Sequence, residues 1–123
     1  MCRLKVLSVG LSELATLRDA LMLRAHSKLA VVSNYWDLSS MSLQREEFHV
    51  AVLNEPNSAR ELRRCSQYIR RTWPNAAVLL LGDSSELLEY QLYDARLPTR
   101  IGPADLLAVI DRLSQEGAVE PAA

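Results

Sequence analysis

The sequence predicts a single doubly wound α/β domain, in which a five-stranded parallel sheet lies between two layers of helices. Short apolar runs alternate with amphipathic segments about five times over, as in sheets whose strands are covered on both faces. The chain has 123 residues, enough for one core, and its 49% hydrophobic and 24% charged residues are typical of globular domains. No repeat or linker divides it. We therefore expect one domain over residues 1–117 and a disordered tail over 118–123.

Three strands and two helices are predicted in the first half of the chain. Strands are expected at residues 4–9, 29–33 and 50–53, because each is a short apolar run with turn-forming residues next to it. A helix should follow the first strand, with Ser12 as its N-cap. A weaker helix is expected over residues 41–47.

The second half contains three predicted helices and two strands. A helix is expected over 58–72 and a strand over 77–81, which is the most apolar run of the chain. A fourth helix should cover 86–95, and a short polar strand should follow at 99–101. The last helix is predicted over 103–117, since a proline opens it and a glycine ends it. Five parallel strands of this kind usually take the order 2-1-3-4-5.

Composition and residue spacing exclude several classes of protein. The net charge of −1 gives no overall attraction to nucleic acid or an anionic membrane. Cys2 and Cys65 are the two cysteines, too few for a disulfide framework, and no signal peptide or membrane-length apolar run is visible, so a cytoplasmic protein is expected. His26 and His49 have no carboxylate or thiol at metal-ligand spacing. Because the chain begins at Met and ends soon after the last helix, we expect no attached output domain.

Binding and chemistry in an open parallel sheet belong at the carboxyl ends of the strands. The residues expected there are Gly10 and Leu11 after the first strand, Asn54 after the third, Gly82 after the fourth and Gly102 after the fifth. None of these five side chains is charged. No catalytic constellation is visible among them, so the protein is not expected to be an enzyme.

From about residue 4 to residue 113, the order and lengths of the elements and the final Gly-Pro before a helix resemble the receiver domain of bacterial two-component response regulators (CheY-like, with a flavodoxin-like fold). In that family an aspartate at the end of strand three is phosphorylated beside Mg²⁺. Carried over by position, the family's acidic pair falls on Gly10 and Leu11 and the phosphoacceptor on Asn54. Its hydroxyl residue falls on Gly82 and its lysine on Gly102, so every one of these positions departs from the family's chemistry.

The resemblance therefore implies a degenerate receiver, or pseudo-receiver. An amide is a poor nucleophile toward phosphorus, and Mg²⁺ requires carboxylate ligands. The register is uncertain by one residue, so Glu55 could occupy the acceptor position as a fixed negative charge. The family's aromatic switch residue falls near Thr99. We expect a stand-alone module that acts through protein contacts, independently of phosphorylation, with no cofactor or metal.

The alternative function is a sensor of a small anion or nucleotide at the strand ends. Its candidate contacts are Gly10, Ser12, Asn54 and Ser84, since glycines leave room there and a helix N-terminus attracts anions. Turn and capping geometry is the simpler explanation of the same glycine and serine residues.

Two surfaces are candidates for a protein partner. By resemblance, the face made by helix four, strand five and helix five is where receivers form dimers and effector contacts. The helix expected over 86–95 has more apolar and aromatic residues than one inward stripe accommodates, so some are expected to be exposed or to lean over the sheet edge. The predicted interface residues are Leu88, Tyr90, Tyr93, Arg100, Asp105 and Arg112.

The second surface is the outer side of the helix over 58–72, which is rich in arginine. It could contact an acidic partner or a phosphate backbone, or be an ordinary solvated face; a nucleic-acid partner is not expected, since no nucleic-acid motif is present. The arginines are Arg60, Arg63, Arg64, Arg70 and Arg71.

Overall fold

Five parallel strands form one sheet: β1 (Leu4–Val9), β2 (Ser27–Val32), β3 (Val50–Asn54), β4 (Ala77–Leu81) and β5 (Ala95–Leu97). Their order is β2-β1-β3-β4-β5, which confirms the predicted order. The helices are α1 (Leu14–Met22), α2 (Tyr35–Ser40), α3 (Ala59–Thr72) and α4 (Pro103–Ala118). The computed structural model describes residues 4–11, 14–24, 26–40, 47–54, 59–82 and 93–118.

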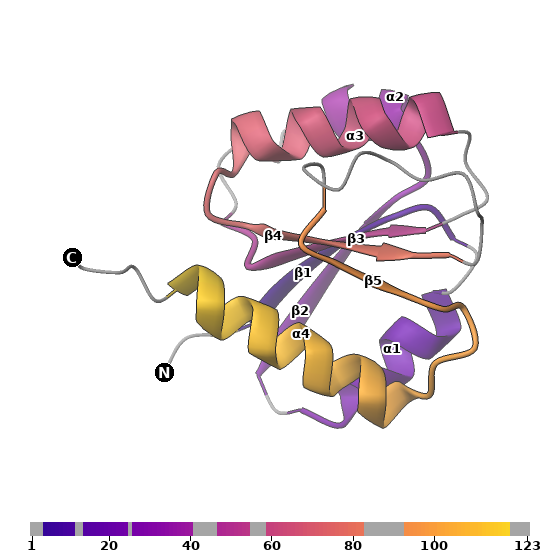
Figure 1. The fold of residues 1–123 in the computed structure, drawn as a ribbon, viewed down its shortest axis with the longest axis vertical. Helices are drawn as coiled ribbons and strands as arrows, with labels where there is room; N and C mark the ends of the chain where they lie inside the picture. Colours follow the sequence, from indigo (N-terminus) through magenta and orange to yellow (C-terminus); the bar gives the residue numbers. More distant parts are fainter. Residues whose placement is uncertain are drawn as a thin grey trace.

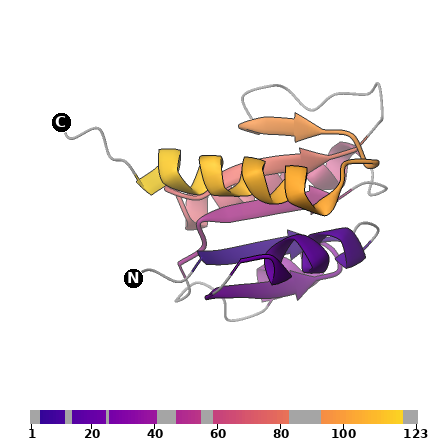
Figure 2. The same ribbon diagram turned by 90° about the horizontal axis from the view of Figure 1, so that it is seen from below.

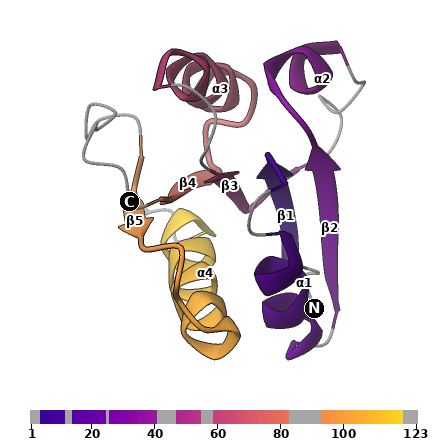
Figure 3. The same cartoon turned by 90° about the vertical axis from the view of Figure 1, so that its right-hand side faces the viewer.

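The sheet is covered on both faces. Helices α2 and α3 lie over one face, and α1 and α4 lie over the other (Figures 1 and 3). Figure 2 shows α1 and α4 side by side. The inner strands β1, β3 and β4 are buried almost throughout, whereas the edge strands β2 and β5 are partly exposed. This burial explains why β3 and β4 are continuous apolar runs rather than alternating ones.

Each face of the sheet has its own apolar cluster. The cluster under α1 and α4 includes Leu17, Leu106 and Ile110, which recur at helical spacing on those helices. The cluster under α2 and α3 contains most of the aromatic side chains. Phe48 and Trp73 meet edge to face with ring centres 5.0 Å apart, and the Tyr68 ring lies 6.1 Å from that of Trp73. Such aromatic pairs contribute to the stability of the fold in addition to the contribution of the surface they bury.

The predicted position of strand five is wrong. The strand is β5, at Ala95–Leu97, whereas residues 99 and 100 form a turn. Asp94 begins the pairing with β4, because its backbone N–H donates to the Val78 carbonyl and its carboxylate accepts the Val78 N–H at 2.7 Å. The predicted fourth helix therefore cannot extend to 95, and its remaining residues up to 92 lie outside the described part of the chain.

The described helix between β2 and β3 begins earlier in the chain than the predicted span. Helix α2 begins at Tyr35, and Asn34 caps it, since the Asn34 Oδ1 accepts the Asp37 N–H at 3.0 Å. A carboxylate oxygen of Glu61 on α3 accepts the Tyr35 N–H at 3.2 Å and ties the two helices together. The predicted span over 41–47 lies outside the described residues up to 46, and Glu47 is not helical.

The remaining elements agree with the sequence to within a few residues. Strand β2 begins two residues earlier than predicted, and α4 continues through Ala118, so the first residue of the expected tail is helical. The tail from 119 onward lies outside the described residues. Among the described helices, none combines the length and the apolar character that crossing a membrane requires.

Cys65 is a buried free thiol on the inner face of α3. Burial raises its pKa to about 12, and the negative charge of Glu61 contributes in the same direction. Because the thiolate is the reactive form, we expect the folded protein to react with a thiol reagent at pH 8 orders of magnitude more slowly than free cysteine. A Cys2→Ser background isolates Cys65 in this measurement. Rapid, complete labelling of that variant under native conditions would contradict the burial of the thiol.

Candidate functional site

The carboxyl ends of the inner strands meet at one edge of the sheet, seen on the right in Figure 1. Val9 pairs with Leu53, and Asn54 pairs with Leu81. Gly10 and Gly82 come directly after these residues, so they lie beside the end of β3. Both glycines continue the sheet, because the Gly10 N–H donates to the Val32 carbonyl and the Gly82 N–H to the Leu97 carbonyl.

Asn54 is the centre of this edge, and its side chain is fully buried. Its Nδ2 donates to the Ser8 hydroxyl oxygen at 3.1 Å, the Val9 carbonyl at 3.2 Å and the Gly10 carbonyl at 3.4 Å. Backbone carbonyls only accept hydrogen bonds, so the amide must present its nitrogen to them. The side chain of Asn54 therefore links β3 to β1, and its orientation is fixed.

The other end of the same amide is its oxygen, Oδ1. The Asn54 Oδ1 is buried and finds no hydrogen bond among the described residues. An unsatisfied buried acceptor costs about 1–3 kcal/mol. A ligand that donates a hydrogen bond, or a cation, would satisfy this oxygen.

Gly10 and Gly102, both at this edge, differ in whether the structure requires a glycine at their position. Gly10 has a φ of 98°, a conformation that side chains rarely adopt, and it directs its carbonyl toward Asn54. At Gly102, by contrast, an added Cβ would meet nothing within 4 Å. The backbone conformation therefore explains glycine at position 10, whereas position 102 has room for a side chain.

The described edge carries no charged side chain at the five predicted positions. Leu11 is 54% exposed, and Gly102 accepts the Leu106 N–H with its carbonyl at the start of α4. Mg²⁺ binding in proteins relies on carboxylate oxygens, which these positions do not supply. Across the described residues, no group of three or more acidic, histidine or cysteine side chains could hold a metal ion. Glu55, Ser12 and Ser84 lie outside the described residues.

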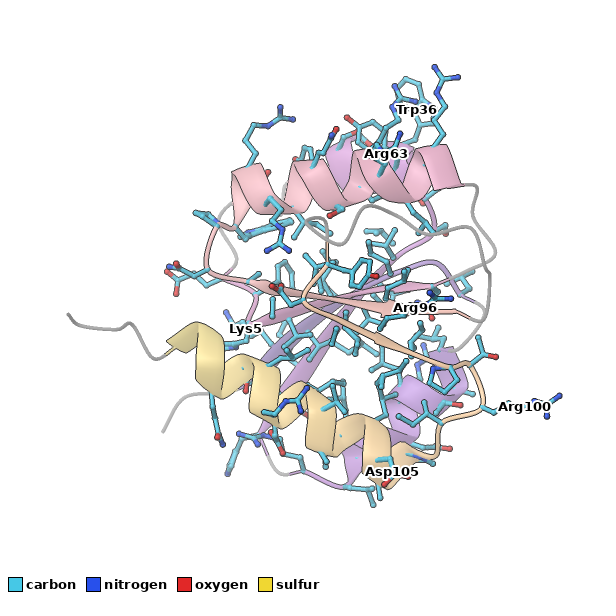
Figure 4. All side chains as sticks on the ribbon, viewed as in Figure 1. Lys5, Trp36, Arg63, Arg96, Arg100 and Asp105 are labelled. Carbon is cyan, nitrogen blue, oxygen red and sulfur yellow. The ribbon has the colours of Figure 1, made fainter. Side chains whose placement is uncertain are left out.

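The predicted interface residues divide between two sides of the molecule. Tyr93 packs against the cluster on the α3 side. Asp105 and Arg112 are exposed on α4, on the opposite face, and Arg100 projects away from the turn before α4 (Figure 4). Leu88 and Tyr90 lie outside the described residues. The structure therefore brings Asp105 and Arg112 onto one surface and places Tyr93 elsewhere.

The arginines of α3 also differ from one another. Arg60, Arg63, Arg64 and Arg71 are exposed, whereas Arg70 turns toward β5 and pairs with Asp94 at 3.3 Å. The placement of Arg70 on the outer face was therefore wrong. Of the two histidines, His26 is exposed, and His49 accepts the Lys5 N–H at its Nδ1, a contact within the sheet.

Sequence reasoning missed two residues. Ser8 has its hydroxyl in the Asn54 network, and its polarity within a buried strand was the available signal. Trp36 is 77% exposed on α2, where the polar surroundings of a large aromatic residue were the signal.

No protein-family model matches the chain, and no curated protein matches it. Among solved structures, the chain is similar to a CheY-like response regulator receiver domain protein from Methanospirillum hungatei. The TM-score is 0.77 and the identity 15%, over 94% of this chain and 97% of that one. It is also similar to adenylate cyclase from Rhodopirellula baltica, with a TM-score of 0.75 and 17% identity over 94% and 90% of the two chains.

A third similar structure is the chemotaxis response regulator CheY4 of Vibrio cholerae. Its TM-score is 0.72 at 16% identity, and the match covers 91% of this chain and 99% of that one. At these identities the likeness establishes the fold. The chain has a CheY-like receiver fold, as the sequence resemblance implied.

Proposed function

We propose that this chain is a degenerate receiver domain that acts through protein–protein contacts and is not regulated by phosphorylation. The observation that carries the proposal is the position of Asn54. It ends β3, where receivers carry their phosphoacceptor, and its amide nitrogen is held by three oxygen atoms of β1 and the residue after it. This arrangement supports a structural role for Asn54, at the position where receivers carry a reactive aspartate.

The chemistry of the surrounding edge supports the same proposal. Phosphoryl transfer to a receiver needs a carboxylate nucleophile, a metal held by acidic residues and a cation to balance the product. A phosphoryl group adds about −1.5 to −2 charge. Gly10, Leu11, Gly82 and Gly102 offer neither metal ligands nor a compensating cation. The site would therefore not stabilise the phosphorylated state.

The outer face of α4 is the proposed contact surface between two copies of the chain. Its exposed residues recur at helical spacing: Asp105, Ala108, Arg112 and Gln115. Two α4 helices crossing antiparallel about a twofold axis would place Asp105 of each against Arg112 of the other, with the small Ala108 between them. Such an interface is self-complementary, as twofold symmetry requires.

Sedimentation velocity over a range of concentrations tests this proposal. We expect a reversible dimer that Arg112→Asp weakens about tenfold, because like charges then face one another across the interface. The double variant Asp105→Arg/Arg112→Asp restores the opposite charges and should recover most of the affinity. Arg60→Asp, the same charge change on α3, is the control and should have no effect.

Acetyl phosphate with Mg²⁺ should leave the dimerisation constant of the wild-type protein unchanged. A monomer at all concentrations would contradict the homodimer. A dimer whose affinity changes when the phosphodonor is added would contradict independence from phosphorylation.

A sensor of a small ligand at the strand ends is the second candidate. The Asn54 Oδ1, which has no hydrogen-bond partner among the described residues, favours it. This oxygen accepts hydrogen bonds, so it selects for a ligand with a donor group, such as the amino group of a nucleotide base, over a simple anion. Thermal-shift measurements with nucleotides and with inorganic phosphate separate these ligands. A melting temperature that no nucleotide raises, even at millimolar concentration, would contradict the sensor.

A further inference from the structure

The outer face of α3 carries a row of exposed residues, three of them arginines. The row consists of Arg60, Arg64, Gln67 and Arg71, spaced so that they lie along one side of the helix. From first to last it extends roughly 16 Å, given the helical rise per residue. Among the described residues, no carboxylate forms an ion pair with any of these three arginines. The row is therefore a line of positive charge open to solvent.

Aromatic rings hold two of these arginines in place. The Arg64 guanidinium carbon lies 5.0 Å from the centre of the Tyr35 ring, and that of Arg71 lies 5.9 Å from the centre of the Tyr68 ring. Cation–π contact of this kind favours one position of the guanidinium group. A partner that binds these groups therefore loses less side-chain entropy than it would on mobile arginines.

Trp36 adds an apolar anchor beside the row. Its side chain is 77% exposed on α2, which is tied to α3 through Glu61. The residue next to it on α2, Tyr35, has the Arg64 guanidinium over its ring, and in Figure 4 the labelled Trp36 projects outward on the same side of the molecule as α3. Tryptophan and arginine are the residues that contribute most often to the energetic centres of protein interfaces.

We propose that the row on α3, together with Trp36, binds an acidic helical segment of a partner protein. Carboxylates at positions i, i+4, i+7 and i+11 of such a helix would match the row, and an apolar side chain would cover Trp36. Charge complementarity selects an anionic occupant. A peptide is favoured over the phosphate backbone of a nucleic acid, which is more densely charged. The reasons are the two acidic residues at the Trp36 end of the row, Glu61 and Asp37, and the net charge of −1.

This surface lies on the opposite face of the sheet from α4 (Figure 1). The inference goes beyond the proposed function, because a dimer formed through α4 leaves α3 accessible. A protein that does not dimerise through α4 could still bind a peptide on α3, and a protein that binds no peptide could still dimerise. Self-association is measured without peptide, and peptide binding is measured separately.

Fluorescence anisotropy of a labelled helical peptide tests the inference. The probe carries glutamate at i, i+4, i+7 and i+11 with a leucine beside them, and a second peptide carries lysine at the same positions. We expect the glutamate peptide alone to bind. The variant Arg64→Glu/Arg71→Glu should bind it at least about tenfold more weakly, because like charges would then face each other. Trp36→Ala should also lower the affinity several-fold.

Arg18→Glu is the matched control, because Arg18 is exposed on α1 on the other face of the sheet. It should leave the affinity unchanged. If the double variant melts at a lower temperature, Arg60→Glu provides the same test, because Arg60 contacts no aromatic ring among the described residues. Equal losses in the Arg18 and α3 variants would overturn the inference. So would tighter binding of a single-stranded oligonucleotide of matched charge than of the peptide, or no peptide binding below about 1 mM.

Discussion

Replacing Asn54 with aspartate is expected to destabilise the fold by about 3 kcal/mol at neutral pH, instead of creating a phosphorylation site. The amide nitrogen of Asn54 faces the Ser8 hydroxyl oxygen and the carbonyl oxygens of Val9 and Gly10. A carboxylate has no hydrogen to donate, so the variant loses these hydrogen bonds. It also places a buried negative charge against two carbonyl oxygens.

The effect of Asn54→Asp should depend on pH. Burial and the facing oxygens disfavour the charged form, so the pKa of the introduced carboxyl is higher in the folded than in the unfolded protein. Its neutral form donates a hydrogen bond. The variant therefore regains stability as pH falls through the folded pKa and loses it as pH rises.

Urea unfolding of both proteins at pH 5 and pH 7 measures this difference. Asn54→Ala is the control, because it removes the same donor without adding a titrating group, and its destabilisation should change little between the two pH values. An Asn54→Asp variant as stable as the wild type at pH 7 would contradict the described position of the amide.

Replacing Trp73 with alanine should destabilise the protein by about 3–5 kcal/mol. Trp73 is 6% exposed at the end of α3, and its ring packs against Phe48 and Tyr68. The substitution leaves a cavity in the cluster between α3 and the sheet. It also removes two edge-to-face aromatic contacts.

Trp36→Ala provides the matched comparison for Trp73→Ala. Trp36 is 77% exposed, so its removal should change the free energy of unfolding by less than about 0.5 kcal/mol. Chemical denaturation followed by circular dichroism measures both variants without relying on tryptophan fluorescence. A similar decrease in the free energy of unfolding from the two substitutions would contradict the assignment of Trp73 to the core and Trp36 to the surface.

Much of the fold was predictable because the buried elements also have the clearest apolar patterns in the sequence. The strand at 77–81 was predicted with its observed bounds, since an uninterrupted apolar run is what a strand covered on both faces requires. Strand β5 was misplaced because three residues carry little pattern of their own. The Asp94 contacts with β4 determine where its pairing begins, and they join positions 16 residues apart.

The site was predictable in composition but not in geometry. The positions of Gly10 and Asn54 at strand ends followed from the order of the elements. The hydrogen bonds of Asn54 did not, because they join residues 44 to 46 positions apart and depend on the register between β1 and β3. The helix start at Tyr35 had a local signal in Asn34, a favourable N-cap residue within a polar stretch.

Intact-mass spectrometry of the wild-type protein after incubation with acetyl phosphate and Mg²⁺ tests the central claim most directly. A receiver that retains its phosphoacceptor aspartate serves as the positive control in the same mixture. We predict that the control gains a phosphoryl group while the mass of this chain does not change. A covalently bound phosphoryl group mapped to the carboxyl end of β3 would contradict the account.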